Sequence, residues 1–486
     1  MPILNAIRRC TLRTMQTRSA IALILAVGSA THVVAADGSD ASVRALPADD
    51  SVILLAQAGG EAVESVPSLS APGSAAPIFG GDASTGPVQR SATAGYELTG
   101  AGIGSASIPE QGGILTSTGR GRAIRFQNGI FVYPAVTAGI GHNDNVGGTS
   151  TNEKSSNLFV LRPEAVAELK RRGDRYTLSY AGNYGQYQSS SEDDFTHHDL
   201  WLAGDNYFTT RARMGWGVGY QRRSDARGST DRAGASDSPD RWRAPVARII
   251  GIYGAPKAPG RLELEASWMQ KRYTNNRLST RGSDVDMTMV AGRFFFRVMP
   301  KTSLIFEMRD TWSDYTLNTS PHDNRYRKLL AGVTWDMTAK TTGIVKLGRG
   351  YKDFDRRDRR DPSAGTWEAT LVWSPLTYSV VKLQTEQNIS DSTGAGNFTD
   401  NRGYSLNWDH KWGSFMTSNV NAGMVRADYD GISREDNTRN FGVGVYREVG
   451  HNFRVGVSWS HTKRDSSINT LDFRRNVTML TLETVL

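Results

Sequence analysis

From about Ile130 to the last residues of the sequence, apolar side chains alternate with polar or very small ones at a period of two. The stretch RLELEASW places Leu262 and Leu264 on one side and Glu263 and Glu265 on the other. RARMGWGVGY, TWEATLVW, FGVGVYRE and NFRVGVSW repeat the scheme. This period is the signature of a β-strand whose two faces meet different surroundings. Residues 129–486 are therefore expected to form one all-β domain.

Such strands recur along the whole region, and their connections alternate between short turns, such as SPLT, and long polar loops, such as residues 221–240 and 354–364. Large apolar groups on one face and charges on the other suit a cylinder in lipid, where closure leaves no unpaired edge. The sequence predicts a transmembrane antiparallel up-and-down β-barrel of about 18 strands, whose last strand pairs with the first near FVYPAVTAGI. The strands are expected to begin near residues 130, 158, 176, 197, 211, 242, 261, 285, 303, 326, 342, 366, 378, 402, 415, 438, 452 and 473.

One of these segments, RPEAVAELK, has residues that intrinsically prefer a helix. Leu161, Ala165 and Ala167 nevertheless share one face, opposite Arg162 and Glu168. The alternation outweighs the propensity, and a strand is expected here as well.

The first 36 residues have the features of a secretory signal peptide. They carry four arginines and no acid, an apolar run from about Ala20 to Val27, and Ala35 and Ala36 at a position suited to cleavage. Removal of this peptide would take away Cys10, the single cysteine, and halve the formal net charge of +8. The basic balance therefore gives no support to nucleic-acid binding.

Residues 37–128 are rich in Ala, Gly, Ser and Pro, as in SVPSLSAPGSAAPIFGG. Such a composition cannot bury enough apolar surface to offset the loss of chain entropy on folding. We expect a disordered periplasmic segment between the signal peptide and the barrel. No stretch of 18 apolar residues follows the signal peptide, so no transmembrane helix is expected.

Charged residues on the face opposite the lipid are expected to line the lumen. Charges of both signs can exchange hydrogen bonds with a hydrated sugar chain without binding any one unit tightly, as transit requires. Trp201, Tyr446 and Tyr187, if they face inward, would add surfaces on which sugars can stack. The candidate residues of the substrate path are Arg162, Glu164, Arg211, Arg213, Glu263, Glu265, Glu307, Arg309, Lys382 and Arg454.

Catalytic and metal-binding alternatives have weaker support. His197 and His198 are adjacent, so in a strand they point to opposite faces and cannot chelate one metal together. Glu263 and Glu265 would lie about 6.5–7 Å apart along a strand, which permits a carboxylate pair for glycosidase or lyase chemistry. Charged interiors are the rule in water-filled barrels, however. We expect no enzyme activity, no cofactor and no metal.

A second cluster of charge lies in the predicted loop at 354–364. Its arginines could grip lipopolysaccharide phosphates as bidentate donors. Asp358 and Asp361 could instead compensate them in a solvated loop, and both interpretations stay open. The cluster consists of Arg356, Arg357, Arg359 and Arg360.

Three stretches resemble a known family: FVYPAVTAGIGHNDNV, MPKTSLIFEMRDTWSDY and WEATLVWSPLTYSVVKLQ. Over roughly residues 129–486 the chain is similar to the outer-membrane β-barrel proteins encoded with exopolysaccharide biosynthesis genes, the family described as putative β-barrel porin 2. The resemblance implies an integral barrel in the outer membrane of a Gram-negative bacterium that exports a polysaccharide together with a periplasmic export partner. Membership also implies contact with outer-membrane lipid and lipopolysaccharide, and insertion by the barrel-assembly machinery. Leu486 departs from the aromatic residue that most often ends such barrels.

Two functions follow as expectations. The first is a conduit or scaffold for export of an exopolysaccharide to the cell surface. The second is a general diffusion porin or a surface-adhesion barrel. Trimeric porins usually narrow their lumen with a long inward-folded loop, and the longest external loop here has only about twenty residues, 221–240. That length favours the conduit.

Overall fold

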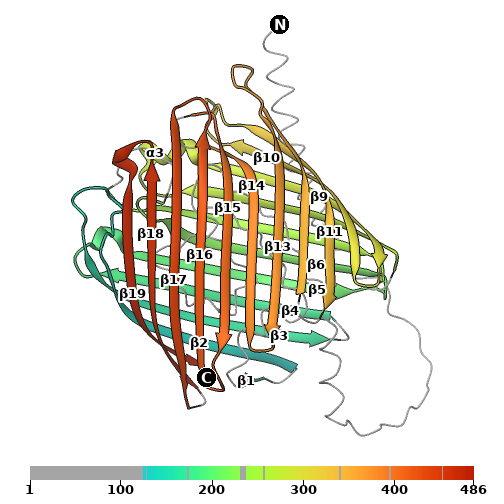
Figure 1. Ribbon diagram of the computed structural model, residues 1–486, viewed down its shortest axis with the longest axis horizontal. Helices are drawn as coiled ribbons and strands as arrows, with labels where there is room; N and C mark the ends of the chain where they lie inside the picture. The colour runs from blue at the N-terminus through green and yellow to red at the C-terminus, as the bar shows by residue number, and fades with distance from the viewer. Residues whose placement is uncertain are drawn as a thin grey trace. The chain divides into compact units, whose positions relative to one another are not determined.

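The computed structural model describes residues 124–126, 129–171, 174–229, 237–255, 258–338, 341–392, 396–450 and 452–485. The strands β2 to β19 form one closed antiparallel sheet, in which each strand pairs with the next along the chain (Figure 1). This is the 18-stranded up-and-down barrel that the alternation predicts. The expected signal peptide and nearly all of the expected disordered segment lie outside the described residues.

The strands are 13 to 16 residues long. Their bounds are β2 (Ile130–Asn143), β3 (Ser156–Arg171), β4 (Asp174–Tyr187), β5 (Phe195–Tyr207), β6 (Ala212–Asp225), β7 (Asp240–Tyr253), β8 (Gly260–Tyr273), β9 (Val285–Met299) and β10 (Thr302–Tyr315). The ring continues with β11 (Asn324–Thr338), β12 (Thr341–Phe354), β13 (Ser363–Leu376), β14 (Ser379–Asp391), β15 (Phe398–Lys411), β16 (Met416–Tyr429), β17 (Arg434–Val449), β18 (Phe453–Ser466) and β19 (Phe473–Val485).

The observed strands begin within four residues of the predicted positions. RPEAVAELK lies in β3, so the strand expected there against helix propensity is confirmed. One short strand was not expected: β1 (Ile124–Arg125) pairs with Phe131 and Val132 of β2. Regular structure therefore begins a few residues before the predicted start of the barrel at 129.

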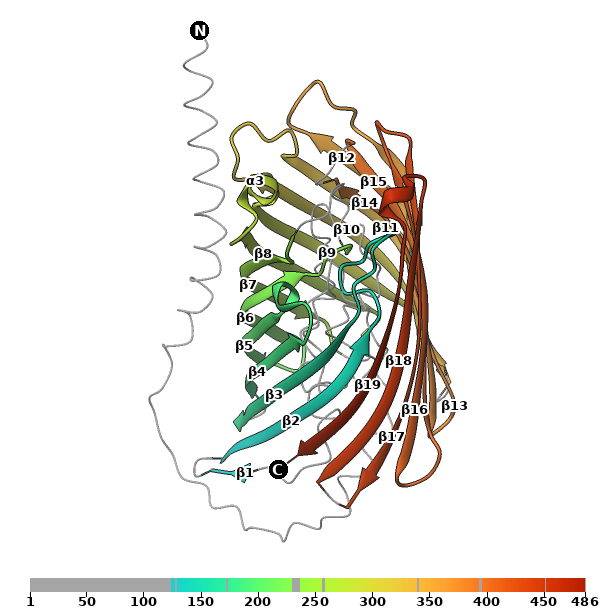
Figure 2. The same cartoon turned by 90° about the vertical axis from the view of Figure 1, so that its left-hand side faces the viewer.

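The ring closes where β19 pairs with β2. Leu482 lies opposite Ala138, and Val477 lies opposite Asn143. Figure 2 shows the two strands side by side. The predicted seam near FVYPAVTAGI is confirmed.

The two faces of the sheet differ as the alternation predicts. Leu264 is 59% exposed, whereas Glu263 and Glu265 are 2% and 3% exposed. On β18, Val457 is 54% exposed and its neighbour Ser458 is 3% exposed. The apolar face is therefore the outer, lipid-facing one, and the polar face lines the lumen.

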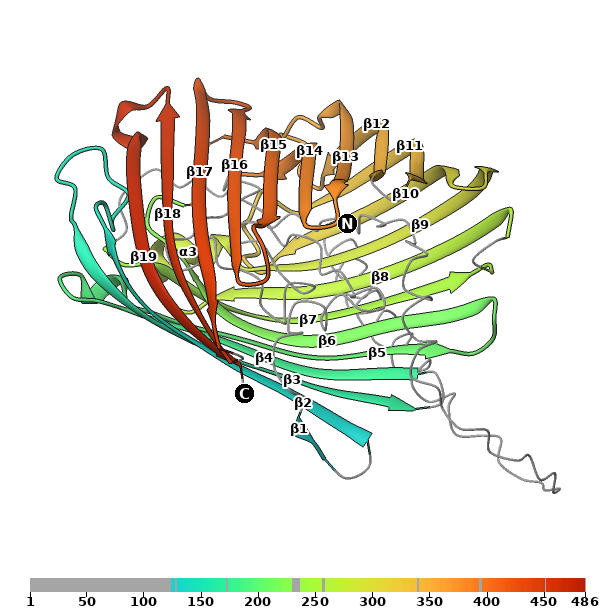
Figure 3. The same cartoon turned by 60° about the horizontal axis from the view of Figure 1, so that its bottom comes forward.

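Connections at the two ends of the barrel differ in length, as Figure 3 shows. At one end the turns are short, and exposed aromatic residues cluster near them, as in a membrane-interface girdle. The other end carries the longer loops, with the short helices η4 (Ser191–Asp193), α3 (Arg277–Thr280), η5 (Arg281–Ser283) and η6 (Asn469–Leu471). Within the described residues, none of the helices is long and apolar enough to cross a membrane. The aromatic residues near the short turns are Phe208, Tyr253, Tyr378, Trp412 and Phe415.

Candidate functional site

A belt of ion pairs crosses the lumen wall from β7 to β13. Three of its members lie directly opposite one another on neighbouring strands, because Arg293 on β9 pairs with Glu263 on β8 and with Glu307 on β10. We call the whole set the charged belt. It consists of Arg248, Arg261, Glu263, Glu265, Arg293, Glu307, Arg309, Lys328, Lys346 and Glu368.

The carboxylates on β8 each contact two cations. Glu265 accepts a hydrogen bond of 2.6 Å from the Nε of Arg248 and one of 2.5 Å from the Nη2 of Arg293. Glu263 lies 3.4 Å from Arg261 and 3.6 Å from Arg293. Arg293 thereby bridges two acids of its neighbouring strand and continues toward β10.

The carboxylates farther along the belt each contact three cations. Glu307 contacts Arg309 at 2.5 Å, Lys346 at 2.8 Å and Arg293 at 3.7 Å. Glu368 contacts Lys346 at 2.6 Å, Arg309 at 2.8 Å and Lys328 at 3.1 Å. Lys328 and Arg309 lie directly opposite each other in the ladder. Glu368, which touches both, offsets the repulsion between these like charges.

These ion pairs are important for stability because the charged groups are buried. The side chains of Glu307, Arg309 and Lys346 are at most 2% exposed. A charge removed from water is stable only when opposite charges and hydrogen bonds replace its hydration, and removal of one partner then leaves the other uncompensated. The belt is therefore a fixed array of alternating charge on the inner wall, with each acid held in place by several cations.

The structure brings together four of the predicted path residues and separates the others. Glu263, Glu265, Glu307 and Arg309 are members of the belt. Arg211 does not face the lumen from a strand: it precedes β6 in a short turn and is exposed. The remaining candidates lie on strands that do not contribute to the belt: Arg162 and Glu164 on β3, Arg213 on β6, Lys382 on β14 and Arg454 on β18. Arg213 is nevertheless close enough to Glu263 to interact with it electrostatically.

Six of the ten residues of the charged belt were not among the candidates predicted from the sequence. Arg293 lies in the run AGRFFFRV, where apolar residues occupy both faces and hide the alternation. Lys328 and Lys346 share their faces with the buried Leu330 and Ile344. Successive residues of a strand point to opposite faces, so the face of each missed residue could have been counted from a residue of the same strand whose face is already known. The missed members are Arg248, Arg261, Arg293, Lys328, Lys346 and Glu368.

The lumen wall also carries aromatic and apolar side chains. Trp201, Tyr187 and Tyr446 are at most 7% exposed and lie on the inner face. Tyr446 covers Gly456 so closely that a Cβ there would lie 2.3 Å from the ring, and the Arg454 guanidinium lies 4.2 Å from the ring centroid. A bulky group at position 456 would displace this tyrosine rather than simply fill the lumen. Toward the long-loop end of β7, β8 and β9 the inner face is apolar, with Trp242, Val246, Met269, Met287 and Met289.

A loop turns inward at the long-loop end. Val146, between β2 and β3, packs in one buried cluster with the inner-face residues Leu158 and Met479. Asn145 ties the loop down, because its Nδ2 donates to the carbonyl oxygens of Thr149 and Arg474 at 2.8 and 2.9 Å. The loop between β2 and β3 is therefore held against the inner wall at the mouth, and the preference for the conduit that was based on loop length stays a prediction.

The same arrangement involves the loop between β6 and β7. Arg475 on β19 donates to the carbonyl oxygens of Asn145 and Arg227, at 2.8 and 3.0 Å. Arg227 in turn forms an ion pair with Asp193 of η4. Three loops and the closing strand are therefore held together at the mouth.

Arg359, from the arginine-rich loop between β12 and β13, joins two other loops, the one between β10 and β11 and the one between β14 and β15. Its guanidinium donates to the carbonyl oxygens of Pro321, Gly396 and Asn397, at 2.9 to 3.0 Å. Arg356 instead pairs with Asp358 at 2.7 Å on the exposed side of the loop. One arginine of the cluster thus fixes the loops, and another is compensated in solvent.

The two adjacent histidines point to opposite faces, as predicted. His197 is 6% exposed and its Nε2 lies 2.9 Å from the Ser224 hydroxyl. His198 lies on the outer side, where its Nδ1 is 3.0 Å from the hydroxyl of Tyr180. Within the described ranges, no group of three or more His, Cys, Asp or Glu side chains is placed to hold a metal ion.

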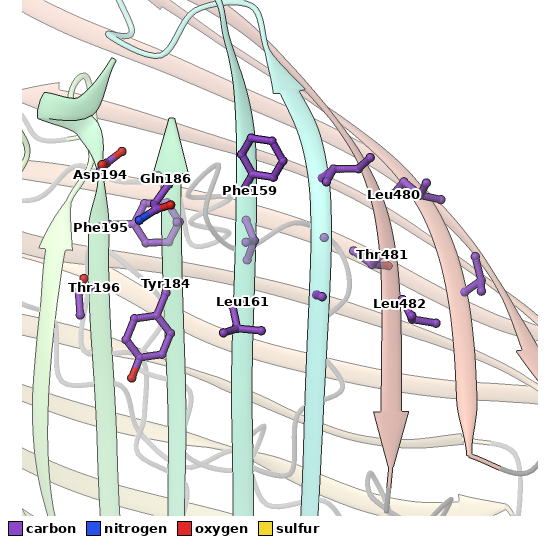
Figure 4. Close-up of a pocket in the computed structure, with 16 residues that line it drawn as sticks. Phe159, Leu161, Tyr184, Gln186, Asp194, Phe195, Thr196, Leu480, Thr481 and Leu482 are labelled. Carbon is purple, nitrogen blue, oxygen red and sulfur yellow. The ribbon is translucent and has the colours of Figure 1, made fainter. Parts of the chain in front are cut away.

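A groove of about 830 Å³ lies beside the seam. Phe159, Leu161, Leu480 and Leu482 line it (Figure 4) and are 45–54% exposed on the outer face. The groove therefore faces lipid, and it is separate from the path through the lumen.

Comparison with curated protein sequences gives no match. Among solved structures, the barrel resembles Pseudomonas aeruginosa OccK2 (OpdF) in complex with glucuronate, with 13% identity, a TM-score of 0.43, and coverage of 73% of this chain and 98% of that one. The barrel also resembles P. aeruginosa OpdK with vanillate, with 12% identity and a TM-score of 0.43. The match covers 73% of this chain and 99% of OpdK. A third similar structure is the Neisseria meningitidis FrpB iron transporter (F3-3 variant), with 10% identity and a TM-score of 0.38. That match covers 68% of this chain and 62% of the transporter.

These likenesses are too distant to assign a solute. The sequence profile of the family described as "Putative beta-barrel porin 2" is more informative, because it matches residues 127–485, nearly the whole barrel. The family resemblance read from the sequence is thereby confirmed, although its exopolysaccharide context stays a prediction. The chain is a porin-like β-barrel and belongs to the putative beta-barrel porin 2 family.

Proposed function

We propose that this barrel is a diffusion channel of the Gram-negative outer membrane that passes small hydrophilic solutes. The observation that carries the proposal is the charged belt. Its acids are each held by two or three cations, so charges of both signs are fixed around the lumen. Most of these side chains are buried, and a passing solute can reach the belt at Arg261 and Glu368, whose side chains are 32% and 12% exposed. Such groups favour entry of a hydrated solute without the deep binding that would prevent its exit.

The inward loop supports the same function. Val146 is buried against the inner wall, and Asn145 tethers the loop at the mouth. A loop held in this position favours small solutes over a polymer. Exopolysaccharide export, the function that we expected first, is supported by the resemblance alone, and no described contact favours a sugar chain over smaller solutes.

The test is conduction by the purified full chain in planar lipid bilayers. Glu368→Gln removes the carboxylate that contacts Arg309, Lys328 and Lys346. The three cations then lose a shared partner, so the reversal potential in a salt gradient should shift toward anion selectivity. Glu435→Gln is the matched control, because Glu435 is exposed on the outer face of β17. Equal reversal potentials for both variants would show that the belt does not line the conducting path.

A second measurement separates the channel from the conduit. Deletion of the protein should slow uptake of small hydrophilic solutes and leave the amount of surface polysaccharide unchanged. Accumulation of polymer in the periplasm, with normal solute uptake, would overturn the channel in favour of export.

A further inference from the structure

A row of basic side chains crosses the outer face of four neighbouring strands. His198 on β5 lies opposite Arg222 on β6, Arg222 lies opposite Arg243 on β7, and Arg243 lies opposite Arg272 on β8. Directly opposed residues of an antiparallel pair have Cβ atoms about 4.5–5.5 Å apart. Three arginines and a histidine therefore lie side by side at one level of the barrel. We call these four residues the basic row.

The row faces outward. Arg222 follows the exposed Tyr220 and Val218 on the same face of β6, and Arg222 and Arg243 are themselves exposed. The inner-face neighbours of Arg243, Trp242 and Ala244, are buried in the lumen. The row is therefore separate from the charged belt and takes no part in the solute path.

The row lies at the edge of the apolar band. On β7 the outward positions from Tyr253 to Pro245 are all apolar or glycine, and Arg243 follows. Ten residues of a strand cover about 33 Å, or about 25 Å along the membrane normal at the usual tilt. That is the height of the apolar band of an outer-membrane barrel, so Tyr253 and Arg243 mark its two boundaries. The arginines lie at the boundary next to the long loops.

The charges of the row are only partly compensated. Arg272 donates to Asp286 at 2.5 Å and to the carbonyl oxygens of Lys271 and Val285. Arg222 and Arg243 have no ion pair within the ranges that the structure describes. Like charges directly opposite each other destabilise a sheet. An anion between these two arginines would remove that repulsion.

We propose that the basic row binds the phosphate groups of lipid headgroups in the outer leaflet, the phosphorylated glycolipid anchor of lipopolysaccharide. Guanidinium groups bind phosphate through paired hydrogen bonds. Tyr220 and Val218, one and two steps below Arg222 on the same face, then contact the acyl chains of the same lipid. The inference rests on the proposed outer-membrane location, with the long loops outside.

The experiment measures binding of bis-phosphorylated lipid A to the purified full chain in detergent by native mass spectrometry. Arg222→Gln combined with Arg243→Gln should weaken binding at least tenfold. Arg171→Gln combined with Arg447→Gln removes the same charge from exposed outer positions near the short turns, and it should leave binding unchanged. Lipid A without phosphates should bind weakly to the unaltered protein. Its affinity should match that of phosphorylated lipid A for the Arg222→Gln, Arg243→Gln variant. Inorganic phosphate at millimolar concentration should not displace the lipid.

Two outcomes would overturn the proposal: equal binding by both double variants, or equal binding of the two lipids. Conductance measured on the same samples separates this site from the channel. If the barrel conducts and the Arg222/Arg243 double variant binds lipid A as well as the unaltered protein does, only the proposed lipid site at the basic row is contradicted. If the barrel binds phosphorylated lipid A more tightly than lipid A without phosphates but does not conduct, only the proposed channel function is contradicted.

Discussion

The Nη1 of Arg359 lies 2.9 Å from the Nδ1 of His322, and because a guanidinium can only donate, the imidazole accepts this hydrogen bond. His322 belongs to the loop between β10 and β11, outside the membrane-spanning strands. Burial lowers the pKa of His322 to about 4, while Asp391 acts in the opposite direction and Arg359 adds to the decrease. The contact therefore requires the neutral imidazole.

The first prediction concerns pH. Because the folded-state pKa of about 4 lies below the ordinary value of 6.5, the contact contributes full stability above about pH 6.5. This contribution is lost progressively as the pH falls toward 4. Spin labels at Thr319 and Asp358 should report a broader distance distribution at pH 4.5 than at pH 7. The variant His322→Gln, which does not titrate, should show the same distribution at both values. Equal broadening with and without the histidine would exclude it as the cause.

The second prediction concerns the two faces of β18. Val457→Arg places a charge on the lipid-facing side near the middle of the strand and should cost about 2–4 kcal/mol of folding free energy. Ser458→Arg, one residue away on the inner face, should cost less, because the guanidinium can reach water and the carboxylates of the lumen. Unfolding in urea in the presence of lipid vesicles measures both changes. Similar costs would contradict the assignment of inner and outer faces.

The third prediction concerns the inward loop. Asn145→Ala removes the hydrogen bonds to Thr149 and Arg474, each of which contributes about 0.5–1.5 kcal/mol. The loop should then leave the wall more often, and single-channel recordings should show larger conductance with more frequent fluctuations. Asn152→Gly is the control in the same loop, because Asn152 is exposed and has a φ of 53°, which glycine adopts readily. Unchanged recordings for the Asn145 variant would show that this loop does not limit the opening.

The fourth prediction concerns the orientation of the barrel. A cysteine at Asp358, in the loop between β12 and β13, should react with a membrane-impermeant thiol reagent on intact cells. A cysteine at Ala255, in the turn between β7 and β8, should react only after the cells are opened. The single natural cysteine, Cys10, lies in the predicted signal peptide, so the background should be low. The opposite labelling pattern would invert the barrel and place the basic row in the inner leaflet.

The strands could be predicted from the sequence because each one reports its own two surroundings. Leu262 and Leu264 alternate with Glu263 and Glu265 within four residues, and no other part of the chain is needed to read that pattern. The same reasoning identified β3 in spite of its helix propensity. The outward-facing Leu161 of β3 is 47% exposed, so the strand presents an apolar face to the lipid side in spite of its helix propensity.

The contacts of the charged belt could not be predicted in this way. Glu368 meets Arg309, which is 59 residues away in the chain, because the stagger between strands brings β10, β12 and β13 to one level. Alternation gives the face of a residue but not its height on the wall. The inward loop was missed for a different reason: Asn145 and Arg475 are 330 residues apart, and their contact exists only because the ring closes.

The seam between β2 and β19 has a consequence for the order in which this barrel can fold. Every other pairing among the described strands joins consecutive segments, so each can form as a local hairpin. The seam brings together Asp144 and Asn476, which are 332 residues apart. Closing a free loop of that length costs about 5 kcal/mol in chain entropy, against about 2 kcal/mol for ten residues. The cylinder can therefore grow strand by strand as an open sheet and become a barrel in a single late event, which only the first and last strands carry out.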